Sequence, residues 1–142
     1  MPISLPFSTL EAYENFVYTL ANRYPSIKYS TLVFVRLDPL AGERAGELHF
    51  AGNIVLRVFE IVDFRSQRIL KYGYEVYRGT EQLYWYDDFP HPHIPALAGT
   101  LPHHKHVPPD VKHNRVPAPE LSFEQANLPF LIEEIGQSLL AD

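Results

Sequence analysis

The sequence has 142 residues, no cysteine and a formal net charge of −5, from 12 basic and 17 acidic side chains. This length suits one domain, the absence of cysteine excludes disulfides and thiolate zinc sites, and the acidic balance argues against a general polyanion-binding surface. The first residues lack the pattern of a signal peptide, and no stretch approaches the roughly 20 apolar residues of a membrane span. We therefore expect a single cytoplasmic domain over residues 1–142 that has no membrane partner.

Residues 8–24 have the pattern of an amphipathic helix. Ser8 and Glu11 match a capping box, in which each side chain bonds a backbone N–H near the other residue. Apolar side chains then recur at helical spacing as far as Tyr24, and Pro25 ends the pattern. The sequence therefore predicts an N-terminal helix.

Residues 27–87 predict an antiparallel sheet. Five segments rich in β-branched and aromatic residues are expected as strands: 27–37, 48–50, 54–64, 68–77 and 82–87. Residues 38–46, which include Pro39 and two glycines, are expected as a loop. In the fourth segment, period-2 alternation places Leu70 on one face with Tyr72 and Tyr74. The short connections require antiparallel neighbours, since a parallel crossover needs a dozen or more residues.

Two further segments complete the predicted fold. Residues 89–119 contain eight prolines, which argues against helix and interior strand because proline lacks an N–H and fixes φ. We expect this segment to form a long functional loop across the sheet. Residues 127–140 predict a helix that Asn127 caps, with Pro129 in its first turn. The predicted fold class is α+β: an antiparallel β-meander of four to five strands, N-terminal and C-terminal helices, and a long His/Pro-rich loop.

The His/Pro-rich loop differs from the rest of the chain in charge and in histidine content. Residues 91–119 carry three cations and one carboxylate, a local charge of +2, so the remainder carries −7. Six of the seven histidines lie within the 23 residues from His91 to His113. A solvated connector is the plain interpretation of such a loop. A connector has no need of imidazole, however, and this loop directly follows a strand end with aromatic rings and two carboxylates.

One functional interpretation is metal binding. His91/His93 and His104/His106 are pairs at i, i+2, and extended backbone presents both rings of such a pair on one face. That arrangement suits a transition metal, with a neighbouring aspartate as an oxygen ligand.

The other functional interpretation is proton transfer. RNA cleavage through the 2′-OH needs a base, an acid and a cation beside the developing phosphorane. We assign His104 and His106 as the acid/base pair. Lys105 or Arg115 is assigned as phosphate stabiliser, and Asp87 as the carboxylate that orients an imidazole. Substrate contacts are assigned to His91, His103, Tyr86 and Asp88. This mechanism requires no metal or other cofactor, and we expect none to be bound.

Two motifs in this region identify a family. Tyr-Asp-Asp-Phe-Pro-His occupies residues 86–91, and Leu-Pro-His-His-Lys-His occupies residues 101–106. With the strand pair before them and the leucine-rich end after them, from about Gly52 to Ile135, the sequence resembles the TumE toxins of bacterial toxin–antitoxin modules. The resemblance implies a small toxin that is held by a cognate antitoxin.

We therefore predict the toxin component of a bacterial toxin–antitoxin system, acting as a metal-independent ribonuclease in the cytoplasm. The expected partners are a cognate antitoxin and RNA, and a homodimer is a further assembly to test. The alternative is a non-catalytic regulatory or metal-binding protein whose His-rich loop docks a partner.

Overall fold

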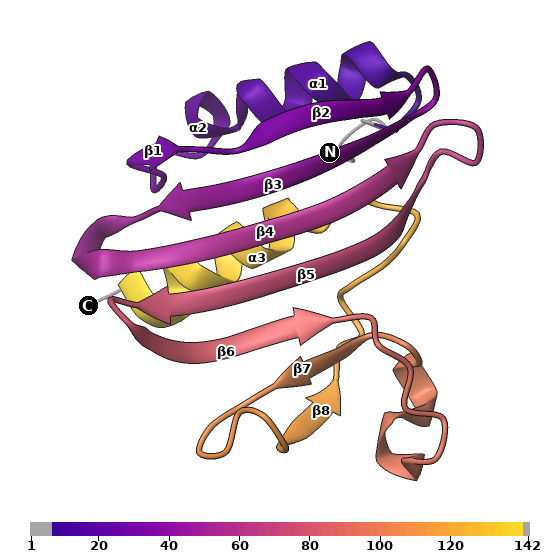
Figure 1. The fold of residues 1–142 in the computed structure, drawn as a ribbon. Helices are drawn as coiled ribbons and strands as arrows, with labels where there is room; N and C mark the ends of the chain where they lie inside the picture. The colour runs from indigo at the N-terminus through magenta and orange to yellow at the C-terminus, as the bar shows by residue number, and fades with distance from the viewer. Residues whose placement is uncertain (1–6, 141–142) are drawn as a thin grey trace.

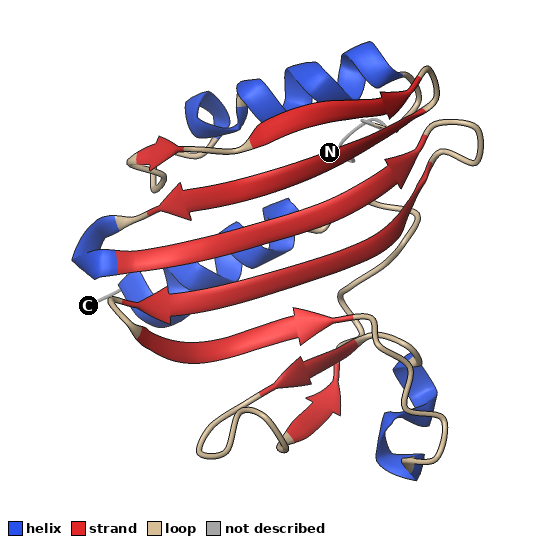
Figure 2. Cartoon of the chain, in the orientation of Figure 1, coloured by secondary structure: helices blue, strands red, loops and turns tan. Residues whose placement is uncertain are grey.

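One antiparallel sheet runs through the chain, with helices packed on one of its faces (Figures 1 and 2). The computed structural model describes residues 7–140, so the N-terminal six residues, to which the expectation of no signal peptide applies, lie outside the described part. The sheet has the strand order β1-β3-β4-β5-β6-β7-β8, and β2 pairs with β3 along the same edge as β1. The fold is α+β, as predicted. The prediction of four to five strands is wrong, because the sheet contains eight within residues 7–140.

The elements have the following bounds. The strands are β1 (Tyr29–Ser30), β2 (Val33–Asp38), β3 (Ala41–His49), β4 (Ile54–Asp63), β5 (Arg68–Arg78), β6 (Glu81–Asp87), β7 (His104–His106) and β8 (Arg115–Pro117). The α-helices are α1 (Leu10–Tyr18), α2 (Leu20–Arg23) and α3 (Leu128–Ile135). Two 3₁₀ turns, η1 (Ala51–Asn53) and η2 (Pro95–Thr100), and a π-helical turn, η3 (Gly136–Leu140), complete the set. Within residues 7–140, no helix is both long enough and apolar enough to cross a membrane.

The N-terminal helix is shorter than predicted and is interrupted. Thr9, not Ser8, is the N-cap, because its Oγ1 accepts a hydrogen bond from the Ala12 N–H at 3.0 Å. At Thr19 the side-chain hydroxyl donates to the Asn15 carbonyl at 2.7 Å, a back-bond that bends helices. The chain therefore passes from α1 into the short α2 at this residue, instead of continuing as one helix to Tyr24.

The predicted loop at residues 38–46 is mostly strand, since β3 begins at Ala41. Its glycines are sites where other groups come close to the backbone. A Cβ on Gly42 would lie 2.2 Å from the Phe34 ring, and one on Gly46 would lie 2.5 Å from the Thr31 carbonyl oxygen. Gly46 also has a φ of +140°. These glycines therefore reflect close packing of β3 rather than a turn.

The predicted alternation along β5 fails at Leu70. The register of β4 and β5 shifts between Ile61 and Val62, so Leu70 is the extra residue of a β-bulge. Ile69 is consequently 0% exposed and Leu70 is 52% exposed. Beyond the bulge, Tyr72 and Tyr74 face the core as predicted.

The His/Pro-rich segment extends the sheet instead of forming one long loop. β7 pairs with β6, and β8 pairs with β7. The three residues of β7 contain no proline, so each can take part in a strand interior even though prolines flank them. In Figure 1 the connection that contains η2 projects from the lower end of the sheet, beside β7 and β8. The strand structure of β7 positions the site, because a strand fixes the face to which each side chain points.

Helices α1 and α3 cover the same face of the sheet, behind the strands in Figure 1. Between helices and sheet lies a buried ion pair of Arg44 and Glu60, which are 1% and 0% exposed. Glu60 also accepts hydrogen bonds from the hydroxyls of Tyr13, at 2.6 Å, and Tyr74. The opposite face of the central strands carries no helix (Figure 2).

Asn127 occupies the N-cap position of α3, as predicted, but its side chain bonds Tyr74 and Ser122 instead of the helix. Its side-chain nitrogen donates to the Tyr74 hydroxyl at 3.1 Å and to the Ser122 carbonyl at 2.9 Å. Asn127 makes no side-chain cap hydrogen bond to α3, which ends at Ile135 and continues as η3. The predicted helix over residues 127–140 is thus a shorter helix followed by a π-helical turn.

Candidate functional site

The register of β6 and β7 brings aromatic, acidic and imidazole side chains together. Trp85 is opposite His106, and Asp87 is opposite His104. Directly opposed residues share a face of the sheet, and successive residues of a strand alternate between faces. These four side chains therefore lie on the face that carries no helix.

Asp87, His104 and His106 form a compact group, which we call the His–Asp cluster. The Nε2 atoms of the two histidines are 3.0 Å apart. His104 Nε2 lies 2.9 Å from Asp87 Oδ1, and His106 Nε2 lies 3.5 Å from Asp87 Oδ2. The side chains of His104 and His106 are 1% and 5% exposed, whereas that of Asp87 is 29% exposed. Asp87 is thus the side from which solvent reaches the cluster.

Backbone carbonyls fix both imidazole rings. His104 Nδ1 lies 3.1 Å from the Pro102 carbonyl oxygen, and His106 Nδ1 lies 2.8 Å from that of Val111. A carbonyl only accepts hydrogen bonds, so each Nδ1 carries its hydrogen and donates. In a neutral ring the Nε2 atom then presents a lone pair to the cluster.

Hydrogen bonds also fix the carboxylate of Asp87. The Trp85 indole N–H donates to Oδ2 at 3.1 Å, and the Phe89 backbone N–H donates to Oδ1 at 3.1 Å. The Trp85 ring also stacks on His106, with ring centroids 3.9 Å apart. Trp85 therefore positions two members of the cluster at once.

The electrostatics of the cluster favour a negative carboxylate beside a positive group. Burial raises the pKa of Asp87, but the hydrogen bonds from His104 and His106 outweigh it and hold this pKa far below its usual range. Burial also opposes the charged form of His104, yet the hydrogen bonds to Asp87 and to the Pro102 carbonyl leave its pKa raised. The cluster thus stabilises positive charge between its nitrogen and oxygen atoms.

Two more of the predicted site residues lie next to the cluster. The His91 ring meets the His104 ring edge-on, with centroids 4.9 Å apart. Arg115 is opposite His106 in the β7–β8 pair, so both side chains lie on the same face. Burial and then the charge of Arg115 lower the pKa of His91. His91 and Arg115 are therefore placed to contact a molecule bound at the cluster.

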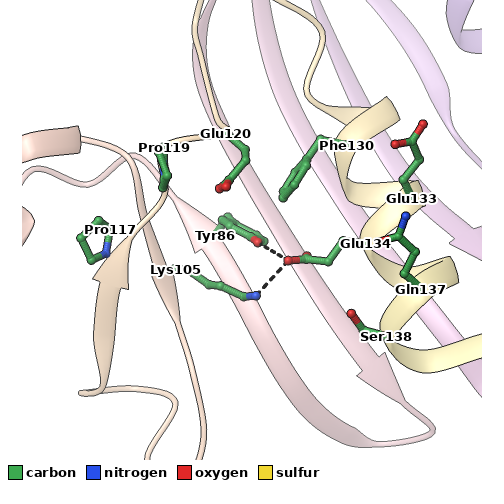
Figure 3. Close-up of a pocket in the computed structure, with 10 residues that line it drawn as sticks. All are labelled: Tyr86, Lys105, Pro117, Pro119, Glu120, Phe130, Glu133, Glu134, Gln137 and Ser138. Carbon is green, nitrogen blue, oxygen red and sulfur yellow. Dashed lines mark hydrogen bonds and ion pairs between the residues drawn. The ribbon is translucent and has the colours of Figure 1, made fainter.

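Lys105 and Tyr86 point to the other face, toward α3 (Figure 3). Lys105 Nζ and the Tyr86 hydroxyl both donate to Glu134 Oε2, at 3.0 and 2.8 Å. They line a pocket of about 460 Å³ that also holds Glu120 and Glu133. This pocket carries more carboxylates than cations, so it is poorly suited to phosphate.

His103 and Asp88 are not among the residues whose ligand atoms converge in the cluster. His103 stacks on the Tyr72 ring, and its Nδ1 lies 2.6 Å from the Tyr72 hydroxyl. Burial raises the pKa of Asp88, and the charge of Asp88 in turn contributes to the raised pKa of Tyr72. The structure thus brings together Asp87, His91, His104, His106 and Arg115. Tyr86, His103 and Lys105 make their side-chain hydrogen bonds elsewhere.

A pocket that the sequence did not indicate opens beside Asp87. It has a volume of about 280 Å³, and its lining includes Arg57, Gly73, Trp85 and Asp87. Gly73 is opposite Asp87 in the β5–β6 pair, and nothing lies within 4 Å of where its Cβ would be. An isolated glycine within a strand pattern is a signal for close approach of another group. It was the feature of the sequence that could have indicated this pocket.

Comparison with known proteins gives a family match. A family model described as "Toxin TumE" matches residues 17–139, which is most of the chain. The match includes all eight strands and the whole of the His–Asp cluster. No curated protein and no solved structure matches the chain.

Proposed function

This chain belongs to the TumE toxin family, and we propose that it is a ribonuclease whose reaction takes place at the His–Asp cluster. Membership of the family implies the toxin component of a toxin–antitoxin system and suggests an antitoxin partner. The proposal adds the reaction, the cytoplasm as the place where the toxin meets RNA, and the residues that act.

The observation that supports this proposal is the convergence of Asp87, His104 and His106. Their ligand atoms all lie within 4.8 Å of one another, and the group is largely buried except at Asp87. Hydrogen bonds and stacking fix every member, which is the condition for a preorganised reaction centre. The pocket beside Asp87 gives a substrate access to the same face of the sheet.

Neighbouring side chains suit a strand of RNA. Trp85 borders the pocket and has an aromatic ring on which a base can stack. Arg115 lies on the cluster side of β8 and can neutralise a phosphate. The cluster can activate the 2′-OH in one of two ways. The imidazoles would transfer protons themselves, or the cluster would hold a metal ion whose charge makes a bound hydroxyl more acidic.

The test compares three substitutions on adjacent strands. Asp87→Asn keeps the side-chain size and removes the carboxylate charge. His106→Gln keeps a polar side chain and removes the imidazole. Lys105→Met serves as the matched control, because Lys105 lies beside His106 in sequence but faces α3. Each variant is expressed in bacteria without an antitoxin, and new RNA ends are mapped. The purified proteins are then assayed on the same RNA, and thermal melts show whether each variant is folded.

We expect Asp87→Asn and His106→Gln to lose roughly 10²–10⁴ in cleavage rate, the usual contribution of a general acid or base. Lys105→Met should keep cleavage and toxicity. Growth arrest with intact RNA would refute the ribonuclease and favour the non-catalytic binder. Full toxicity of folded Asp87→Asn would show that the reaction lies elsewhere. Light scattering of the same preparations decides between a monomer and a homodimer.

A further inference from the structure

We propose that the His–Asp cluster binds one divalent ion of a first-row transition metal, with Asp87, His104 and His106 as the protein ligands. The catalytic use of this ion rests on the proposed function, but its binding does not. The histidine spacing alone fits a metal-free mechanism, whereas the geometry of the three side chains favours the metal-binding alternative.

Three electron-pair donors meet in the cluster. Both Nδ1 atoms are committed as donors to the carbonyls of Pro102 and Val111, so both Nε2 atoms face the carboxylate of Asp87. If one Nε2 carries a proton, that proton can form a hydrogen bond to only one neighbouring atom of the cluster. Two other atoms with lone pairs then still face each other without a hydrogen between them. A cation at the centre satisfies all three atoms at once.

The spacing of the donor atoms fits such an ion. A tetrahedral zinc ion with bonds of about 2.0–2.1 Å separates its ligand atoms by roughly 3.3 Å. The two Nε2 atoms are 3.0 Å apart, and their contacts with Asp87 measure 2.9 Å to Oδ1 and 3.5 Å to Oδ2. With one ligand atom from each residue, all three atoms lie within 4.8 Å of one another. Small movements of the side chains therefore suffice to admit the ion.

The outer contacts are those of a metal site. Histidine ligands of a metal usually donate their second ring N–H to a carbonyl or carboxylate, and carboxylate ligands are hydrogen-bonded in turn. Both histidines donate to backbone carbonyls, and Asp87 accepts from the Trp85 indole and the Phe89 backbone. Each ligand is thus oriented before the ion binds.

The ligand types narrow the choice of ion. Two imidazoles and one carboxylate suit zinc, iron(II), cobalt(II) or nickel(II), whereas calcium and magnesium prefer sites built from oxygen. Three protein ligands leave a coordination position for water or substrate, as in catalytic zinc sites. His91 is the next imidazole outside the three ligands, with its ring centroid 4.9 Å from that of His104.

The test uses the full chain without a histidine tag, stripped of metal by chelator and then dialysed. Zinc binding is measured by calorimetry, and cobalt(II) is added as a spectroscopic probe of coordination. We expect one ion per chain, a thermal midpoint that rises with zinc, and visible cobalt bands of a site with nitrogen and oxygen ligands. His106→Gln and Asp87→Asn should abolish the cobalt spectrum. Trp85→Phe, which keeps an aromatic ring and removes the indole N–H, should weaken zinc binding about 10-fold or more.

His93→Gln is the matched control, because His93 belongs to the other i, i+2 pair and is exposed. It should bind zinc with unchanged affinity. The proposal is overturned if the folded wild-type chain binds no stoichiometric ion, or if His93→Gln loses as much affinity as His106→Gln. If the protein binds the ion but does not cleave RNA, the ribonuclease proposal is refuted and the metal site stands. Undiminished cleavage by metal-free protein in chelator would refute the catalytic ion and leave the ribonuclease standing.

Discussion

The buried pair of Arg44 and Glu60 gives a sharp test of what holds the helices on the sheet. We consider Glu60→Gln, which preserves the size of the side chain but replaces one of its two oxygens with an NH₂ group, whereas Tyr13 donates to Oε1 and Tyr74 to Oε2 in the wild-type protein. The substitution removes the negative charge that faces the Arg44 guanidinium. Burial lowers the pKa of Arg44, but the Glu60 carboxylate outweighs that effect, so the guanidinium is charged in the wild-type protein.

The expected loss follows from the burial of both partners. Arg44 and Glu60 are each 1% exposed at their side chains, so Arg44 cannot turn to water when its partner is neutral. Removing one member of a buried pair costs about 3–5 kcal/mol, because the other charge stays buried without compensation. For a domain of this size, such a loss lowers the thermal midpoint by roughly 10–20 °C.

Urea unfolding measures the free energy of unfolding, and the denaturant dependence should not change. The control is Glu75→Gln, because Glu75 pairs with Arg57 at 3.7 Å but their side chains are 37% and 54% exposed. An exposed pair of this kind contributes at most about 1 kcal/mol. Arg44→Met combined with Glu60→Gln removes both charges and should be more stable than Glu60→Gln alone. A loss below about 1 kcal/mol for Glu60→Gln would refute the reasoning.

Two further predictions concern the tyrosines and β3. Five buried tyrosines have pKa values raised above the ordinary value, chiefly by burial: Tyr13, Tyr72, Tyr74, Tyr84 and Tyr86. The folded state retains protons that the unfolded state releases, so the contribution of these tyrosines to stability is constant below about pH 10 and falls above it. Phenolate absorbance should show these five of the nine tyrosines ionising only as the protein unfolds, and their ionisation in the folded state would contradict the prediction. Gly46→Ala places a Cβ 2.5 Å from the Thr31 carbonyl oxygen at a φ of +140° and should cost about 1–3 kcal/mol in urea unfolding, whereas Gly73→Ala, with open space at its Cβ, should change stability little.

The strands that sequence patterns predicted well are those whose side chains alternate against one core. β4 covers residues 54–63 where 54–64 was expected, and β5 and β6 agree with the prediction to within one residue at each end. Only the end of β3, within the predicted strand 48–50, is predicted as strand, because the two glycines of residues 41–46 are typical of a turn when only neighbours in sequence are considered. Their actual role is to admit Phe34 and Thr31 from β2 and the residues that precede it, and such tertiary contacts leave no trace in a local pattern.

Proline content misled in a similar way. The density of prolines over residues 89–119 does disfavour regular structure. However, β7 is only three residues long, and none of the three is proline. Its partner β6 ends 17 residues before β7 begins, so the pairing is not a hairpin signal that a short window of sequence can detect. Asp87 and His104 come together only because β6 and β7 pair. From the sequence alone, the proximity of these two residues could therefore only be a hypothesis.

Alternation along β7 also separates Lys105 from His104 and His106, with which the predicted mechanism combines it. The inference that His104 and His106 share a face already assumes extended backbone, and in extended backbone the residue between them points to the opposite face. The side chain of Lys105 must therefore point away from the face on which the two histidines act together. Its ammonium group lies 3.0 Å from Glu134 on α3. Arg115 is free of this constraint because it comes from β8, directly opposite His106. A cation from this motif region that assists at the His–Asp cluster is thus expected from the neighbouring strand, and Arg115 is the side chain in that position.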